Sequence, residues 1–329
     1  MLKRRGMTRR EFAIATAGAS LAMAGGARAA EFPDRAIKVV VPFGAGSAVD
    51  AVMRIVAPGM TQALNGTPLI VDNRSGATGA IGTQYVAKSS PDGYTLVLGT
   101  VATHATLAAT REDLPYNVVS DFTPIGLMTQ SWTIVVVNTS IPAKNLVELA
   151  EYTKAQPQPL NYASGGVGGV SHLAVEMLRV RTGAKLNHIP YRDAAEGIRD
   201  TIAGHVGLMV YPAAVVPHVR SGELRALAVL APKRLPALAD VPTGIEQGYP
   251  DLVASGWQGL FGPAGLPLPI RDRLGAALRA GVQDPSTSSK LVNQGFDIEA
   301  STPDQFAKFV SNEVAKWTAV ARAPGVQIR

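Results

Sequence analysis

The sequence predicts an α/β protein in two lobes, each built on a mostly parallel sheet that helices cover on both faces. Short apolar, β-rich runs alternate with stretches of helical periodicity along the chain, and this alternation is typical of parallel sheets. A glycine-rich loop lies between a predicted strand and a predicted helix once in each half of the chain. The 329 residues are enough for two domains of ordinary size.

The first part of the chain is expected to form three strands and two helices. In chain order they are a strand at 37–41, a helix at 48–64, a strand at 69–71, a helix at 80–89 and a strand at 94–98. The first strand is rich in valine and ends at Pro42. Pro58 and Gly59 are expected to bend or break the first helix, because proline lacks the N–H that a helix interior needs.

The pattern of strands and helices resumes after Thr133. The segments expected there are strands at 133–137, 161–163, 186–189, 206–210, 224–230 and 257–261, and helices at 146–155, 171–181, 269–281 and 303–320. We expect the last segment to return to the first lobe. Residues 30–132 and 255–329 are therefore assigned to lobe 1, and residues 133–254 to lobe 2.

The N-terminal segment resembles a twin-arginine export signal. Arg9 and Arg10 precede an apolar run at 14–24, and Ala27-Arg28-Ala29 has the small residues of a cleavage site. We expect a signal peptide over 1–29, removed after Ala29, and a periplasmic mature protein; the alternative is a cytosolic basic amphipathic helix. The segment before residue 30 carries +5 of the net charge of +6, so no nucleic-acid partner is expected.

Several kinds of chemistry find no support in the sequence. The chain has no cysteine, which excludes disulfides, thiolate metal sites and a lipid-modified N-terminal cysteine. Its five histidines lack the spacing of a metal site, and we expect neither a metal nor a cofactor. No Gly-x-Ser-x-Gly motif is present. A hydrolase would need Ser171 or Ser47 activated by His172 or His104, and adjacent residues on one helix point in different directions.

Two glycine-rich loops are the candidate binding elements. Loop 1 covers residues 42–50 and loop 2 covers residues 164–172, and in each the backbone N–H groups and a helix N-terminus favour an anion. Neither loop has the ending of a P-loop or a full dinucleotide fingerprint. Ser47 also fits a plain helix cap, and His172 also fits a packing residue. The candidate ligand-binding residues in the loops are Phe43, Ala45, Gly46, Ser47, Ser164, Gly165, Gly166, Gly168, Gly169 and Ser171.

Short motifs along almost the whole mature chain resemble those of one protein family. They lie at 32–34, 40–43, 72–74, 91–96, 114–116, 160–164, 190–191, 224–229, 240–243 and 262–265. In order and spacing they resemble the substrate-binding component of tripartite tricarboxylate transporters, the Bug family. The resemblance implies a two-lobed periplasmic binding protein fold of the second type, in which both loops and ordered water meet a ligand carboxylate and the lobes close over it.

The same resemblance adds a third ligand-facing segment with Thr100 and His104. Tyr211 is expected either to offer its hydroxyl to the ligand or to lie in the hinge. No acidic residue stands near 209–212, which argues against an amino-acid ligand. The implied function is capture of a small di-, tri- or aromatic carboxylate by a monomer that delivers it to the membrane components of a tripartite tricarboxylate-type transporter. The alternatives are a carboxylate sensor for a membrane regulator and a periplasmic hydrolase.

Overall fold

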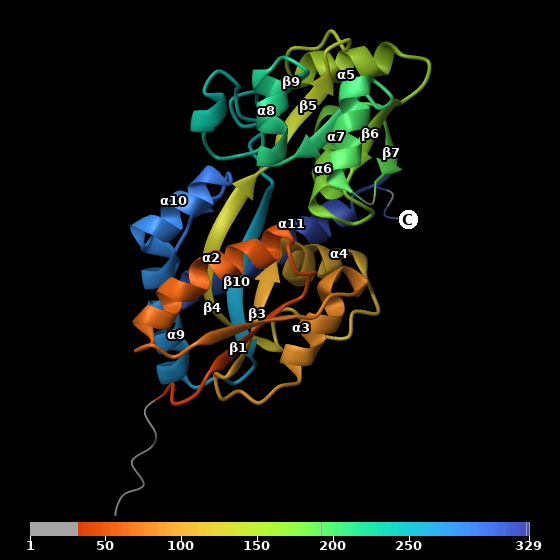
Figure 1. Cartoon of the computed structure of the whole chain (residues 1–329). Coiled ribbons are helices and arrows are strands. Elements are labelled where there is room, and N and C mark those ends of the chain that lie inside the picture. The colour runs from red at the N-terminus through yellow and green to blue at the C-terminus, as the bar shows by residue number, and fades with distance from the viewer. Residues whose placement is uncertain (1–31, 192, 327, 329) are drawn as a thin grey trace, which may run out of the picture.

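The computed structural model describes residues 32–191, 193–326 and 328, which fold into two lobes joined by crossing strands (Figure 1). Each lobe is a mixed sheet flanked by helices, and the expected α/β class is confirmed. The segment predicted as a signal peptide, residues 1–29, lies outside the described residues. None of the described helices is long and apolar enough to cross a membrane.

The sheet of lobe 1 has six strands in the order β11-β4-β10-β3-β1-β2. They are β1 (Ile37–Val41), β2 (Leu69–Asn73), β3 (Thr95–Thr100), β4 (Phe122–Trp132), β10 (Ser255–Pro263) and β11 (Asp297–Ile298). The helices of this lobe are α2 (Ala48–Ala63), α3 (Ala80–Ala87), α4 (Leu107–Thr110), α9 (Leu268–Gln283), α10 (Pro285–Asn293) and α11 (Pro303–Ala321). A 3-10 turn (Ala77–Gly79) precedes α3, and a π-helical turn (Ala102–Thr106) precedes α4.

Helices cover both faces of this sheet. Successive side chains of a strand point to opposite faces. Ile37, Val39 and Val41 accordingly pack with α2 and α9, whereas Val40 belongs to the core on the other side, with α3 and α11. This alternation explains why β1 is apolar except for the half-buried Lys38, since a strand covered on both faces has little solvent side.

The sheet of lobe 2 has five strands in the order β7-β6-β8-β5-β9. They are β5 (Ile134–Asn138), β6 (Leu160–Ser164), β7 (Leu186–Pro190), β8 (Leu208–Tyr211) and β9 (Leu224–Val229). The helices are α5 (Leu146–Ala155), α6 (Val170–Thr182), α7 (Ala194–Ala203) and α8 (Val216–Arg220), with short 3-10 turns at Ala213–Val215 and Pro236–Leu238. Asn145 and Asp193 cap the starts of α5 and α7 with their side chains.

The sheets are mixed rather than mostly parallel. In lobe 1 only β2 and β3 pair parallel with β1, while β10 runs antiparallel between β3 and β4. In lobe 2 β6 pairs parallel with β7 and β8, while β5 is antiparallel to β8 and β9. In lobe 1 the strands β4 and β10 carry the chain out of the lobe and back, so these two neighbours run in opposite directions.

The two crossings lie side by side at Thr133 and Ala254. The N–H and the hydroxyl of Thr133 both donate to the carbonyl of Ala254, at 3.1 and 3.0 Å. The N–H of Leu230 donates to Thr133 at 2.8 Å, and the N–H of Ala254 donates to Leu230 at 3.0 Å. The strands of one sheet come from 37–132 and 255–298, and those of the other from 134–229. Lobe boundaries at 132/133 and 254/255 stay a prediction.

Helix α2 does not break at Pro58, contrary to the expectation. It runs from Ala48 to Ala63 with Pro58 inside it. The neighbouring Gly59 lies where α2 crosses α9, directly against Gly281: a Cβ on Gly59 would stand 2.8 Å from the Cα of Gly281. A Cβ on Gly281 would stand 2.7 Å from the backbone N of Met60. Contact between two glycines therefore sets the closest approach of these helices.

We expect Gly281→Ala to lower the free energy of unfolding by about 1–3 kcal/mol, because the added methyl group forces the backbones of α2 and α9 apart. In an open helix position the same change raises stability by about 0.5–1 kcal/mol. Gly44→Ala is the control, because a Cβ there has nothing within 4 Å. Urea unfolding of both variants measures the difference, and a Gly281→Ala variant more stable than the parent would contradict the expectation.

Candidate functional site

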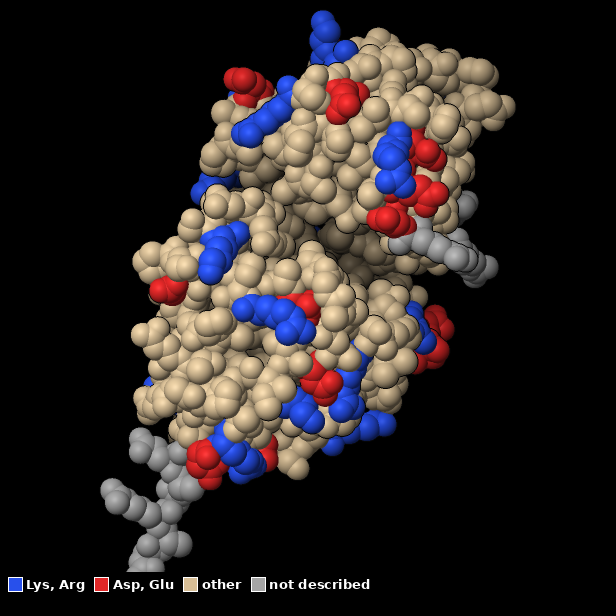
Figure 2. All heavy atoms as spheres, viewed as in Figure 1, with Lys and Arg blue, Asp and Glu red and all other residues tan. Residues whose placement is uncertain are grey.

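A cavity of about 500 Å³ lies between the lobes and is called the interlobe cavity below. Lobe 1 lines it with Phe43, Ala48, Val49, Thr100, Val101, Ala102, Ser131, Gly256, Trp257, Gln258, Gln294 and Phe296. Lobe 2 lines it with Val170, Tyr211, Pro212, Ala213 and Ala214. Figure 2 shows a hollow between the lobes whose visible walls are mostly tan, the colour of residues other than Lys, Arg, Asp and Glu.

Loop 1 is held in place by the buried carboxylate of Asp50. Asp50 accepts the N–H of Gly46 at 2.9 Å, the side-chain amide of Asn73 at 2.9 Å and the Nε of Arg54 at 2.8 Å. The side chain of Asn73 also donates to the carbonyl of Phe43 at 3.0 Å. The hydrogen bond from Arg54 is the main reason that the pKa of Asp50 is lowered to about 2. Ser47 is the N-cap of α2, and its hydroxyl accepts the N–H of Asp50.

Loop 2 uses the N–H groups of its four glycines internally. The acceptors are Ser171 Oγ for Gly165, Ser164 Oγ for Gly166, His172 Nδ1 for Gly168 and the carbonyl of Gly166 for Gly169. Gly168 also has φ 72°, a conformation that side chains disfavour, which explains why glycine stands there. The glycines thus shape the loop around its own hydrogen bonds.

The buried ring of His172 is a hydrogen-bond acceptor that fixes the shape of loop 2. Its ring stacks on His188 with centroids 3.9 Å apart, and His188 in turn contacts the hydroxyl of Ser164 at 2.5 Å. Burial, and then the neighbouring His188, lower the pKa of His172 to about 4. Its ring is therefore neutral near pH 7. Because Nδ1 accepts the N–H of Gly168 at 3.0 Å, the proton of the neutral ring is on Nε2.

The open hydrogen-bond donors lie at the starts of α2 and α6 instead. The first N–H groups of a helix have no acceptor within it. In the described part of the chain no acceptor contacts the N–H groups of Ala48 and Val49 in α2, or of Val170, Ser171 and His172 in α6. Ala48 and Val49 line the interlobe cavity from lobe 1, and Val170 lines it from lobe 2. Two helix N-termini, one from each lobe, therefore meet the same space.

The predicted site residues divide into two groups. Phe43, Thr100 and Tyr211 line the interlobe cavity. The other candidates shape or cap the loops or lie away from the lining: Ala45, Gly46, Ser47, His104, Ser164, Gly165, Gly166, Gly168, Gly169 and Ser171. Both loops thus have residues at the interlobe cavity, and the ligand-binding role of the individual candidates stays a prediction.

His104 lies in the core of lobe 1 and not in the lining of the interlobe cavity. It is fully buried in lobe 1, where its ring stacks on Phe261 with centroids 4.0 Å apart and packs edge-on against Phe122. Its Nδ1 contacts the hydroxyl of Thr103 at 2.9 Å. Burial lowers its pKa to about 3, so the ring is neutral. This placement does not support a contact with a ligand in the interlobe cavity.

Sequence reasoning missed much of the wall. Val49 and Val170 lie within loops 1 and 2 but were not among the candidates, because apolar side chains at these positions fit the buried face of a helix. Gln258, Gln294 and Phe296 come from the last third of the chain. Trp257 reaches the lining but is fully buried, with its indole N–H on Glu313 at 3.1 Å, so it is chiefly a core residue.

A Ser–His pair suited to catalysis does not form in the interlobe cavity. Ser171 Oγ accepts from Gly165 and His172 Nδ1 accepts from Gly168, so these two side chains bond to the loop and not to each other. Ser164 does contact His188, but neither residue lines the cavity. The described residues also hold no group of three or more His, Cys, Asp or Glu side chains placed for a metal ion.

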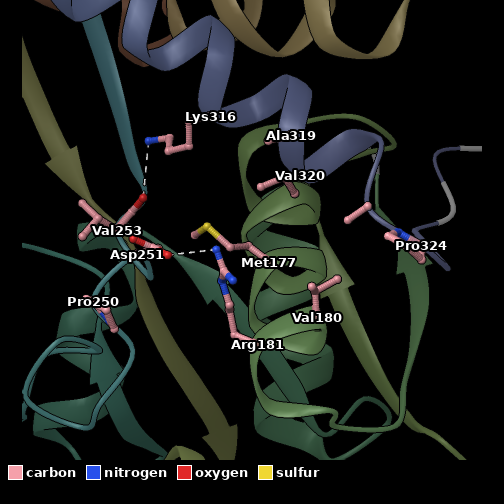
Figure 3. Close-up of a pocket in the computed structure, with 11 residues that line it drawn as sticks. Met177, Val180, Arg181, Pro250, Asp251, Val253, Lys316, Ala319, Val320 and Pro324 are labelled. Atoms are coloured by element: carbon pink, nitrogen blue, oxygen red, sulfur yellow. Dashed lines mark hydrogen bonds and ion pairs between the residues drawn. The ribbon is translucent and has the colours of Figure 1, made fainter.

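A larger cavity of about 690 Å³ lies between α6 and α11 (Figure 3). Arg181 and Lys316 at its wall are already engaged, with Asp251 at 3.0 Å and the carbonyl of Val253 at 3.3 Å. Its lining comes from the C-terminal parts of both helices, where the helix dipole is negative. Because that field disfavours an anion, the interlobe cavity is the better candidate for an acidic ligand despite its smaller volume.

Comparison with known proteins agrees with this geometry. The family model described as the tripartite tricarboxylate transporter family receptor matches residues 52–326. Protein BugT of Bordetella pertussis is 34% identical over 318 residues, which are 96% of each chain.

Solved structures give the same result. MatC of Rhodopseudomonas palustris with bound malate is 32% identical, with a TM-score of 0.74 over 88% of this chain and 100% of that one. An R. palustris protein solved with adipate is 32% identical, with a TM-score of 0.75 over 89% and 98% of the two chains. The chain therefore belongs to the tripartite tricarboxylate transporter receptor family, the Bug family of periplasmic solute-binding proteins.

Proposed function

We propose that this protein captures a small carboxylate in the interlobe cavity and presents it to the membrane components of a tripartite tricarboxylate-type transporter. The observation that carries the proposal is the meeting of two helix N-termini, α2 from lobe 1 and α6 from lobe 2, at one cavity. Export through the twin-arginine signal and action as a monomer belong to the same proposal.

The physical basis is the preference of helix N-termini for anions. Each first turn carries unpaired N–H groups and the positive end of the helix dipole, and both effects favour a carboxylate. A carboxylate bound between Val49 and Val170 would connect the lobes, because those residues belong to opposite walls. Water completes its hydrogen bonds where a backbone group does not reach.

Closure of the lobes over the ligand is part of the proposal. The two lobes already approach each other beside the interlobe cavity: a Cβ on Gly168 would stand 3.3 Å from the hydroxyl of Thr110. At a second contact between the lobes, a Cβ on Gly295 would stand 2.2 Å from the Cβ of Ala213. Rotation about the paired segment at Thr133 and Ala254 would separate these contacts and admit a ligand.

We expect carboxylates, and not their uncharged amides, to stabilise the mature protein. Hexanoate, benzoate, adipate, malate and citrate, each with its amide, form a suitable set for thermal shift measurements. An acid at one hundred times its Kd should add about 2.7 kcal/mol to the free energy of unfolding. Equal stabilisation by an acid and its amide would show that the anion is not what is bound. No stabilisation by any acid would contradict the proposed function.

Val170→Pro should weaken binding by about tenfold or more, because it removes one open N–H from a residue that lines the cavity, and a hydrogen bond to a charged acceptor contributes about 1.5–3 kcal/mol. Proline suits the first position of a helix, and Gly169 before it already has the extended φ −73° and ψ 166° that proline requires. Val170→Ala keeps the N–H and is the control for the lost side chain. Calorimetry with the most stabilising acid measures both, and equal affinities would argue against this donor.

Asp50→Asn should lower the free energy of unfolding by about 1–3 kcal/mol at pH 7, because loop 1 loses its charged acceptor. The folded pKa of Asp50, about 2, lies below its usual value. Its ionised form therefore adds stability above about pH 4 that is lost as the pH falls through 2. Urea unfolding at pH 7, 4 and 2.5 should show a smaller acid loss in the variant.

The control for this change is Asp113→Asn. Asp113 pairs with Arg111 at 2.9 Å, but its side chain is 79% exposed. Exposed ion pairs contribute about 0–1 kcal/mol, so this variant should stay close to the parent. If the two variants lose the same stability, the buried position of Asp50 is not what matters and the account of loop 1 is wrong.

A further inference from the structure

The part of the interlobe cavity wall that the described residues form has no carboxylate, ammonium or guanidinium side chain. Of the 17 described residues that line it, none is Asp, Glu, Lys or Arg. An ionised group that enters an apolar space without a partner loses its hydration at a cost of several kcal/mol. Every charge on a bound ligand must therefore be met by backbone groups, by neutral side chains or by water.

The backbone donors at the cavity suffice for one carboxylate. Among the described residues, three open N–H groups belong to residues that line the cavity, Ala48, Val49 and Val170. One ionised carboxylate has about four acceptor sites. A first carboxylate can thus occupy most of these donors, and a second would have to do without them.

Apolar side chains make up much of the remaining wall. Phe43 and Val49 come from the start of lobe 1, Phe296 comes from the segment before β11, and Val170 and Pro212 come from lobe 2. Aromatic rings offer flat contact surfaces to the body of a ligand, and burial of apolar area contributes about 25 cal/mol per Å². These contacts favour an apolar body over a second charged end.

A negative charge acts on the Tyr211 side of the cavity. Burial first, and then the negative charge of Asp193, raise the pKa of the Tyr211 hydroxyl. Tyr211 lines the cavity, and Asp193 is the N-cap of α7 in the same lobe. Asp193 therefore offers no partner to a second carboxylate at this wall.

We propose that the interlobe cavity selects acids with a single ionised carboxylate and an uncharged, largely apolar body, aliphatic or aromatic, over di- and tricarboxylates. Thr100, Ser131 and Gln258 in the wall are polar and uncharged, and they suit a neutral hydroxyl or carbonyl substituent on that body. This preference differs from the ligands named for two structural neighbours, malate and adipate. It rests on the proposed function, because it assumes that a carboxylate is bound in this cavity.

Matched pairs of acids that differ by one carboxylate test the preference. Calorimetry on the mature protein should give Kd values at least about tenfold lower for hexanoate than for adipate, and for benzoate than for terephthalate. Equal or tighter binding of the diacid in both pairs would overturn the inference, as would binding of malate or citrate alone, while leaving the proposed function intact. Binding of none of the six acids would overturn the proposed function as well.

A charge placed on the wall provides a second test. Gln294 lines the cavity from an exposed position after α10, so a cation there should not disturb the core. Gln294→Lys should improve the affinity for adipate relative to hexanoate by about tenfold, because it supplies the missing partner. Gln294→Met is the uncharged control of similar length and should leave the ratio unchanged. If the lysine variant also leaves it unchanged, the absence of cations does not set the preference and the inference is wrong.

Discussion

The arrangement of the whole molecule depends on a short stretch of paired backbone where the two chain crossings meet. Thr133 bonds twice to the carbonyl of Ala254, and Leu230 bonds to both residues. All three are fully buried. These bonds keep the crossings together while the sheets on either side remain separate units, so a change in the angle between the lobes needs new dihedral angles at only a few residues. The position of each cavity wall relative to the other follows from this pairing.

The glycine-rich loops set the direction of the helices that follow them. In loop 1 the N–H of Gly46 is taken by Asp50, and in loop 2 the N–H of Gly168 is taken by His172. A loop whose donors are satisfied by its own structure holds one shape without a ligand, and that shape aims the following helix. The donors left over, at Val49 and Val170 among others, are thereby presented to the cavity in fixed directions. The acceptors that hold the two loops are neutral groups and a single buried carboxylate, that of Asp50.

The sequence predicted the fold class and most strands, because buried parallel strands form compact apolar runs between turn residues. It did not reveal β4, whose eleven residues include Pro124, Gly126 and a polar end, since such a strand has no apolar alternation to detect. Both predicted loops have residues that line the interlobe cavity. Which N–H groups remain open in them depends on Asp50 and His172, and no local pattern shows how a side chain will bond. Phe296 reaches the wall through tertiary folding alone.

The lack of charge in the cavity wall also affects how the protein responds to its surroundings. Attraction between charges is screened over about 8 Å at an ionic strength of 0.15 M, whereas backbone hydrogen bonds and apolar contacts carry no net charge to screen. Such a wall gives a ligand no long-range guidance, so encounters proceed at the rate set by diffusion and orientation. The capture rate should then stay nearly constant from dilute to saline media, a constancy that a pocket built around arginine would lack.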